Sequence, residues 1–335
     1  MHNILKKFSR FINDIYSKIK SFLINFPSFC QEQYNKLIIN TKDMVVKFNN
    51  LRNTNLDLAK YHLLEGRIFD AKLRLGILNR FITKNDKEVI NLLGWTYYID
   101  GDIDKAFKYF TLANEVKMVN FLSNTDACEQ IPLEIYRSRK SWQANYYDSL
   151  FLEGRNYLPH KVYELLVEFM PVRQSRKILD LGAATGIMAS EFLNNKTGDE
   201  LFAVENSEAM INHINKFYKN LYEKIYYEDT IDFLLHNQEK FDIILSFCSL
   251  DFVKDLSLPL KNIYECLNEG GVFCLTLSTN LEKTKLSLNL ANFVYHLNDV
   301  IKILEKIGYF ILTQNTSKIR NIEYTTIIAK NNYYN

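Results

Sequence analysis

The chain has 335 residues, of which 47% are hydrophobic, so it is long enough to bury a sizeable core and to form two domains. Its formal net charge of +2 gives no electrostatic reason to expect nucleic-acid binding. The five cysteines are scattered and include no Cys-x-x-Cys pair, which argues against a disulfide framework or a zinc knuckle. This pattern fits a reducing compartment, and we expect a cytoplasmic protein.

The first regular pattern covers residues 4–26, where apolar side chains recur at helical spacing along one stripe and Pro27 ends the segment. Lysine and arginine occupy the opposite face, so this basic amphipathic helix either contacts a membrane surface weakly or packs on the next domain. We favour packing. Lysines and serines interrupt every apolar run, which excludes a membrane span and a signal peptide. Residues 1–50 are therefore interpreted as amphipathic and flanking helices.

An internal repeat lies within residues 51–140. Small side chains recur at an offset of 35 residues, from Gly66 to Gly101 (101 − 66) and from Ala71 to Ala106 (106 − 71). This offset is one more than the 34 residues of the tetratricopeptide pattern, a pair of packed helices. Two such units rarely bury a complete core, so we expect flanking helices to cover them. The array predicts either a concave surface for a protein or peptide or a scaffold that only docks on the next domain.

The stretch 177–186 reads Lys-Ile-Leu-Asp-Leu-Gly-Ala-Ala-Thr-Gly. It predicts a buried parallel strand with Asp180 at its carboxyl end, then a turn of small residues and a helix. Gly182, Ala184 and Gly186 leave little side chain between the backbone and a ligand. Open α/β sheets bind ligands at this edge, although an ordinary strand-to-helix turn is the alternative. The Gly-x-Gly-x-x-Gly fingerprint is absent, which argues against a nicotinamide cofactor.

A second predicted strand, residues 201–205, ends in Glu205, whose carboxylate can accept both hydroxyls of a ribose. Asn206 and Ser207 follow as a predicted helix cap.

A third strand end, residues 225–231, contains Asp229 and Thr230, which either contact the ligand or cap the following helix. A fourth apolar strand, residues 241–246, ends at Ser246 beside the same crevice.

The order Asp-Leu-Gly-x-x-x-Gly resembles motif I of the class I S-adenosylmethionine-dependent methyltransferases, and the later strands extend this resemblance over about residues 145–330. Together with the repeats, the chain resembles bacterial methyltransferases that carry N-terminal tetratricopeptide repeats. The resemblance implies that residues 141–335 form a Rossmann-like, doubly wound sheet of seven strands that binds S-adenosylmethionine. It implies a cofactor site formed by Asp180, Gly182, Ala184, Gly186, Glu205, Asn206, Asp229, Thr230, Ser246 and Tyr157. Ala184 stands where the family usually has glycine, and its methyl group can crowd the cofactor.

Asp251 and His296 are the predicted catalytic residues. Asp251 replaces a histidine that related enzymes often carry after the fourth strand, and it either orients the substrate, takes a proton, or caps the following turn. His296 precedes the last predicted helix, residues 297–307, and is either a base or a helix-start residue. No His, Cys and carboxylate cluster has the spacing of a metal site, so we expect no metal.

The sequence therefore predicts methyl transfer to an O, N or S acceptor, with the repeats selecting a protein or peptide. Two alternatives stay open. One is a non-catalytic repeat adaptor with a degenerate methyltransferase domain, favoured by Ala184 and by the missing acceptor-loop histidine. The other is a small-molecule methyltransferase whose repeats are only structural.

Overall fold

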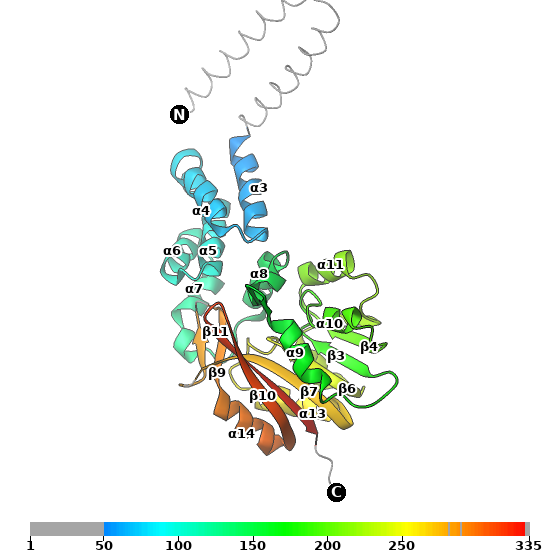
Figure 1. Cartoon of the computed structure of the whole chain (residues 1–335). Coiled ribbons are helices and arrows are strands. Elements are labelled where there is room, and N and C mark those ends of the chain that lie inside the picture. Colours follow the sequence, from blue (N-terminus) through cyan, green and yellow to red (C-terminus); the bar gives the residue numbers. More distant parts are fainter. Residues whose placement is uncertain (1–49, 281, 289, 332–335) are drawn as a thin grey trace, which may run out of the picture.

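The computed structural model describes residues 50–280, 282–288 and 290–331. The helix predicted at residues 4–26 lies outside these described residues. An α-helical part comes first along the chain and an α/β part follows (Figure 1). Within the described residues, no helix combines the length and the apolar character needed to cross a membrane.

The helical part consists of consecutive helices that pack on their neighbours in the chain. Gly94 shows how closely two of them approach, because a Cβ atom there would lie 2.7 Å from the ring of Phe110 on the next helix. Assignment of these helices to the tetratricopeptide type stays a prediction. Their bounds are α3 (Leu51–Leu64), α4 (Ile68–Ile77), the π-helical turn η2 (Leu78–Ile82), α5 (Lys87–Ile99), α6 (Ile103–Ala113), α7 (Val116–Ser123), the 3-10 turn η3 (Thr125–Ala127) and α8 (Leu133–Gln143).

The α/β part begins with a 3-10 turn and a short hairpin and then alternates strands with helices. Its helices are α9 (Leu158–Val167), α10 (Ala189–Asn194), α11 (Glu208–Phe217), α12 (Thr230–His236), α13 (Ser257–Cys266) and α14 (Leu297–Ile307). The other elements are η4 (Tyr147–Phe151), β1 (Leu152–Glu153), β2 (Asn156–Tyr157), β3 (Lys177–Leu181), β4 (Glu200–Val204), β5 (Lys224–Tyr226), β6 (Phe241–Phe247), β7 (Leu267–Asn280), β8 (Lys285–Ser287), β9 (Asn292–His296), β10 (Tyr309–Ile319) and β11 (Ile322–Asn331).

The main sheet has the strand order β10-β11-β7-β6-β3-β4-β5, with β8 and β9 off this path. Strands β7, β6, β3, β4 and β5 are parallel, and β11 runs antiparallel between β7 and β10. The predicted doubly wound α/β sheet and its closing hairpin are therefore confirmed. The short pair β8 and β9, which adds β9 in parallel to the end of β7, was not predicted.

Both faces of the sheet are covered, which explains why β3 and β6 read as nearly continuous apolar runs. One hydrophobic cluster contains residues of α12, α13 and α14, and another contains residues of α9, α10 and α11. Successive residues of β3 divide between them, since Ile178 belongs to the second cluster and Leu179 to the first. This alternation is the two-residue period of a strand.

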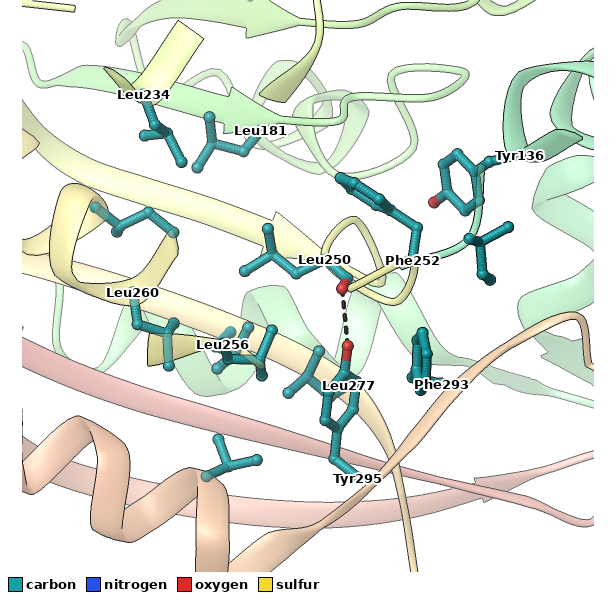
Figure 2. Packing of buried hydrophobic residues seen from close by; sticks show 14 of the residues in the cluster. Tyr136, Leu181, Leu234, Leu250, Phe252, Leu256, Leu260, Leu277, Phe293 and Tyr295 are labelled. Atoms are coloured by element: carbon teal, nitrogen blue, oxygen red, sulfur yellow. Dashed lines mark hydrogen bonds between the residues drawn. The ribbon is translucent and has the colours of Figure 1, made fainter. Parts of the chain in front are cut away.

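The helical part and the α/β part share one hydrophobic cluster (Figure 2). Ile135 of α8 belongs to it together with Phe252 and Phe293 of the α/β part. The backbone joins the two parts as well, because the amide of Ile131 donates to the carbonyl of Phe252 at 2.8 Å. The domain boundary predicted between residues 140 and 141 falls inside α8, which contacts both parts.

Candidate functional site

The site lies where the chain reverses its direction across the sheet. From β3 the chain adds β4 and β5 on one side and then β6 and β7 on the other, so the carboxyl ends of β3 and β6 flank the switch point where such sheets bind ligands. Gly182, after β3, has a φ of 63°, and a Cβ atom there would lie 2.5 Å from Cβ of Ser249, after β6. Glycine is therefore required here both by the backbone conformation and by the approach of the two loops.

Glu205, at the end of β4, holds the turn after β3 in place. Its Oε2 atom accepts a hydrogen bond from the backbone amide of Ala184 at 2.7 Å, and its Oε1 atom accepts from the amides of Asn206 and Ser207. Burial raises the pKa of the Glu205 carboxyl, whereas the hydrogen bonds from Ser207 and Ala184 oppose that shift. The carboxylate predicted to bind a ribose thus also organises the loop and the start of α11.

The predicted cap of α11 is corrected by this geometry. Ser207 occupies the N-cap position, but its hydroxyl makes no capping hydrogen bond. The Glu205 carboxylate accepts the amides at this helix start instead.

Asp180 is buried at the carboxyl end of β3, where the hydroxyl of Tyr222 donates to it at 2.8 Å. Burial raises the pKa of Asp180 from 3.8 to about 7, because the low-dielectric surroundings disfavour the charged form. A carboxyl group whose pKa is shifted this far by burial is often found at a binding or catalytic site.

Asp229 and Asn206 form the side of the site next to β5. The side-chain amide of Asn206 donates to Oδ2 of Asp229 at 3.1 Å, while Oδ1 of Asp229 accepts the amide of Ile231 and caps α12. The capping alternative is therefore realised, although Thr230 beside it lines the pocket described next.

A pocket of about 330 Å³, including the solvent at its mouth, opens at this switch point. The pocket brings together five predicted cofactor residues, Thr230 among them, and four residues that were not predicted from the sequence. It is lined by Tyr136, Lys140, Gly182, Ala184, Glu205, Asn206, Thr230, Ser249 and Phe252.

Tyr136 and Lys140 come from α8, a helix outside the matched strand-and-loop motifs. Their spacing of four residues places both side chains on one face of the helix, a signal that the sequence carries. The spacing alone does not indicate which element packs against that face of α8. The Lys140 ammonium donates to the Tyr147 hydroxyl at 2.9 Å and lies 5.1 Å from the centre of the Tyr136 ring. Burial lowers the pKa of Lys140.

The predicted catalytic residues do not line the pocket. The Asp251 carboxylate accepts from the Tyr136 hydroxyl at 2.8 Å and from the Asn292 amide at 3.1 Å, so it ties α8 to β9. The capping alternative for Asp251 is not seen, and its predicted role toward the substrate stays a prediction. Nδ1 of His296 pairs with Asp299 at 3.1 Å in the first turn of α14, which corresponds to the helix-start alternative.

Five predicted cofactor residues lie outside the pocket lining: Asp180 and Asp229, described above, and Tyr157, Ser246 and Gly186. Tyr157, predicted to contact the cofactor, occupies the N-cap position of α9 and is not part of the lining. Ser246 is buried, and its hydroxyl lies 2.8 Å from that of Ser249. Gly186 has a φ of 80°, and a Cβ atom there would lie 2.9 Å from Leu221. Among the described residues, no group of three His, Cys, Asp or Glu side chains could hold a metal ion.

This arrangement of sheet, small-residue loop and strand-end carboxylates resembles that of class I S-adenosylmethionine-dependent methyltransferases. Residues 153–314 match the family described as "Methyltransferase domain". The match supports the predicted class of enzyme, a methyltransferase, and with it S-adenosylmethionine as the cofactor. It leaves out the helical part, including α8.

Several curated relatives share about a quarter of their residues with this chain. Carboxy-S-adenosyl-L-methionine synthase of Nautilia profundicola is 25% identical over 44% of this chain and 61% of its own length. Polyamine aminopropyltransferase of Serratia proteamaculans is 28% identical over 33% of this chain and 44% of its own length. Arginine-hydroxylase NDUFAF5 of Rattus norvegicus is 28% identical over 56% of this chain and 57% of its own length. The matched region spans less than two thirds of each of these relatives, and their names denote three different reactions.

Solved structures with a similar fold include a methyltransferase from Clostridium acetobutylicum, which is 19% identical to this chain and has a TM-score of 0.44. The match covers 56% of this chain and 97% of that chain. The 1,6-didemethyltoxoflavin-N1-methyltransferase of Burkholderia thailandensis has 14% identity, coverage of 60% and 89%, and a TM-score of 0.47.

Proposed function

We propose that the protein transfers the methyl group of S-adenosylmethionine to a nucleophilic oxygen, nitrogen or sulfur atom. The observation that carries this proposal is the pocket at the switch point, which joins the Gly182–Gly186 loop to the buried carboxylate of Glu205. The residues present fit the cofactor. Glu205 is a buried charged acceptor at the predicted ribose position, and the positive φ angles of Gly182 and Ala184 turn the loop backbone without bulky side chains.

In this function the chain itself binds and orients the two reactants. The cofactor supplies an electrophilic methyl group, and the acceptor attacks it in line with the departing sulfur. Positioning alone can supply much of the acceleration of such a reaction, so no covalent intermediate with the protein is required. Tyr136 and Phe252 line the pocket and are only 7% and 2% exposed, so their rings help to exclude water from it.

The first test is calorimetric titration of the full chain with S-adenosylmethionine and S-adenosylhomocysteine. Binding of both at micromolar concentrations is expected. Transfer of a radioactive methyl group from the cofactor to cell-extract components then tests turnover. A protein that binds neither compound at millimolar concentration would be the adaptor alternative.

We also propose that the helical part recruits the acceptor by binding a protein or peptide. An apolar stripe on the outer side of α4 and η2 supports this second proposal, since Phe69, Leu73, Ile77 and Phe81 are all large hydrophobic residues and are 44–76% exposed. Contiguous exposed apolar surfaces often mark interaction sites. Replacing Phe69 and Leu73 by serine should leave cofactor affinity unchanged and reduce methyl transfer to a protein acceptor. Unreduced transfer would favour a small-molecule acceptor.

A further inference from the structure

The pocket has two walls of different chemistry. Gly182 and Ala184 of the loop after β3, with Glu205, Asn206 and Thr230, form the cofactor wall. The other wall comes from α8 and from the loop after β6, and we call it the acceptor wall; its residues are Tyr136, Lys140, Ser249 and Phe252. The Tyr136 and Phe252 rings lie with their centres 5.1 Å apart and offer an apolar surface (Figure 2).

Lys140 provides the positive charge of the acceptor wall. An ammonium group has three N–H donors, and the described residues use one of them, in the bond to Tyr147. Lys140 forms no ion pair with any carboxylate in the described part of the chain. It lies over the rings of Tyr136 and Tyr147 at 5.1 and 4.5 Å, contacts that stabilise a cation only modestly.

The carboxylates near Lys140 are already engaged. Glu205 accepts three backbone amides, and Asp251 accepts from Tyr136 and Asn292. Their charges contribute to the field at Lys140 without forming a contact pair with it. A partly buried cation without an anionic contact partner is costly, and an anionic ligand would offset that cost.

The same engagement limits the chemistry of the acceptor. An amine or alcohol must lose a proton on methylation, which calls for a base within hydrogen-bond reach. The lining contains no imidazole, and its one carboxylate, Glu205, is bound to backbone amides. A carboxylate acceptor is already ionised at neutral pH and needs no base.

We propose that the acceptor is a carboxylate, held by the Lys140 ammonium and methylated on oxygen. This inference rests on the proposed methyl transfer and names the chemical class of its acceptor. A carboxylate oxygen forms a bond to the methyl carbon while the carbon–sulfur bond breaks, and the electron pair of that bond remains on sulfur. The products are a methyl ester and neutral S-adenosylhomocysteine, and no proton is released. The rings of Tyr136 and Phe252 contact the carbon skeleton beside the carboxylate.

The test uses the full chain with cell extract and S-adenosylmethionine that carries a tritiated methyl group. Methyl esters hydrolyse in mild alkali and release volatile tritiated methanol, whereas N-, S- and ether-linked methyl groups do not. Most of the transferred label should be volatile after alkaline treatment. The variant Lys140→Met should lose about 30-fold or more of this volatile label, as expected when one partner of a buried charge pair is removed. Lys140→Arg should retain part of it.

Arg137→Met, on the exposed side of the same helix, is the matched control and should transfer as the wild type does. Calorimetry with S-adenosylmethionine and with 5′-methylthioadenosine, which lacks the amino-acid part, distinguishes the two sources of a carboxylate. If Lys140→Met weakens only the binding of S-adenosylmethionine, Lys140 holds the carboxylate of the cofactor and the proposal is wrong. Transfer that is entirely stable to alkali also overturns it, while leaving the proposed methyl transfer intact. Absence of any transfer contradicts the proposed function itself.

Discussion

The backbone amide of Ala184 donates a hydrogen bond of 2.7 Å to the carboxylate of Glu205. This bond joins the loop after β3 to the end of β4, two strands that are neighbours in the sheet but separated by a helix in the chain. Because the same carboxylate accepts the amides of Asn206 and Ser207, one buried side chain fixes the shape of two backbone segments around the pocket.

Glu205→Ala should therefore lower both stability and cofactor affinity. Removing the acceptor leaves buried amides unsatisfied, and the loss in binding free energy for S-adenosylmethionine should be about 1.5–3 kcal/mol. Thermal unfolding and calorimetric titration measure the two effects. Glu208→Ala, an exposed carboxylate in the first turn of α11, should cost only about 0.3–1 kcal/mol of stability. Equal effects of the two variants would remove Glu205 from the site.

Ala184→Gly should bind S-adenosylmethionine as well as the wild type or better, with stability unchanged or higher by up to about 1 kcal/mol. The φ angle of Ala184 is 50°, in the left-handed region where alanine is strained and glycine is not. The relief of this backbone strain offsets the larger loss of conformational entropy that glycine undergoes on folding. From the sequence alone, only the entropy loss could be predicted. Ala183→Gly, at a buried position without a positive φ, should instead be destabilising. Equal losses in denaturant unfolding would contradict the strain argument.

Asp180→Asn should gain stability relative to the wild type as the pH rises. The pKa of Asp180 is about 7 in the folded protein, against 3.8 ordinarily, so its protonated form stabilises the fold fully below about pH 4. That contribution is lost as the pH rises to about 7, because ionisation then favours the unfolded chain. The variant should show a flatter fall in melting temperature between pH 4 and 7 and weaker cofactor binding. Parallel curves for the two proteins would show that Asp180 does not titrate in this range.

Gly94→Ala and Gly76→Ala form a pair that tests the packing of the helical part. A Cβ atom at Gly94 would overlap the Phe110 ring, so alanine should cost about 1–3 kcal/mol. Gly76 has nothing within 4 Å of the added atom, and alanine should stabilise α4 by about 0.5–1 kcal/mol. Chemical denaturation of both variants measures the difference. Changes of the same sign would show that α5 and α6 are not packed as described.

Deleting residues 1–27 should lower the melting temperature. The apolar stripe of residues 4–26 needs a partner, and Leu58 and Tyr61 are exposed on α3, the first described helix. An unchanged melting temperature, with loss of salt-sensitive binding to anionic vesicles, would identify the segment as a membrane contact instead.

The sequence alone determined the sheet and its binding edge, because both depend on local patterns. Apolar runs that end in Asp180 and Glu205, separated by helix signals, define parallel strands whose carboxyl ends must share one edge. The last helix, Leu297–Ile307, was located at both ends by its flanking residues.

Only the tertiary structure decided which side chains meet at that edge. Lys140 and Tyr136 reach the pocket because α8, the last helix of the helical part, packs against the α/β part, a contact between segments far apart in the chain. Asp251 reads as a loop carboxylate in the sequence, yet Tyr136 and Asn292 bind both of its oxygens. Long-range packing sets these partners, and no local periodicity records it.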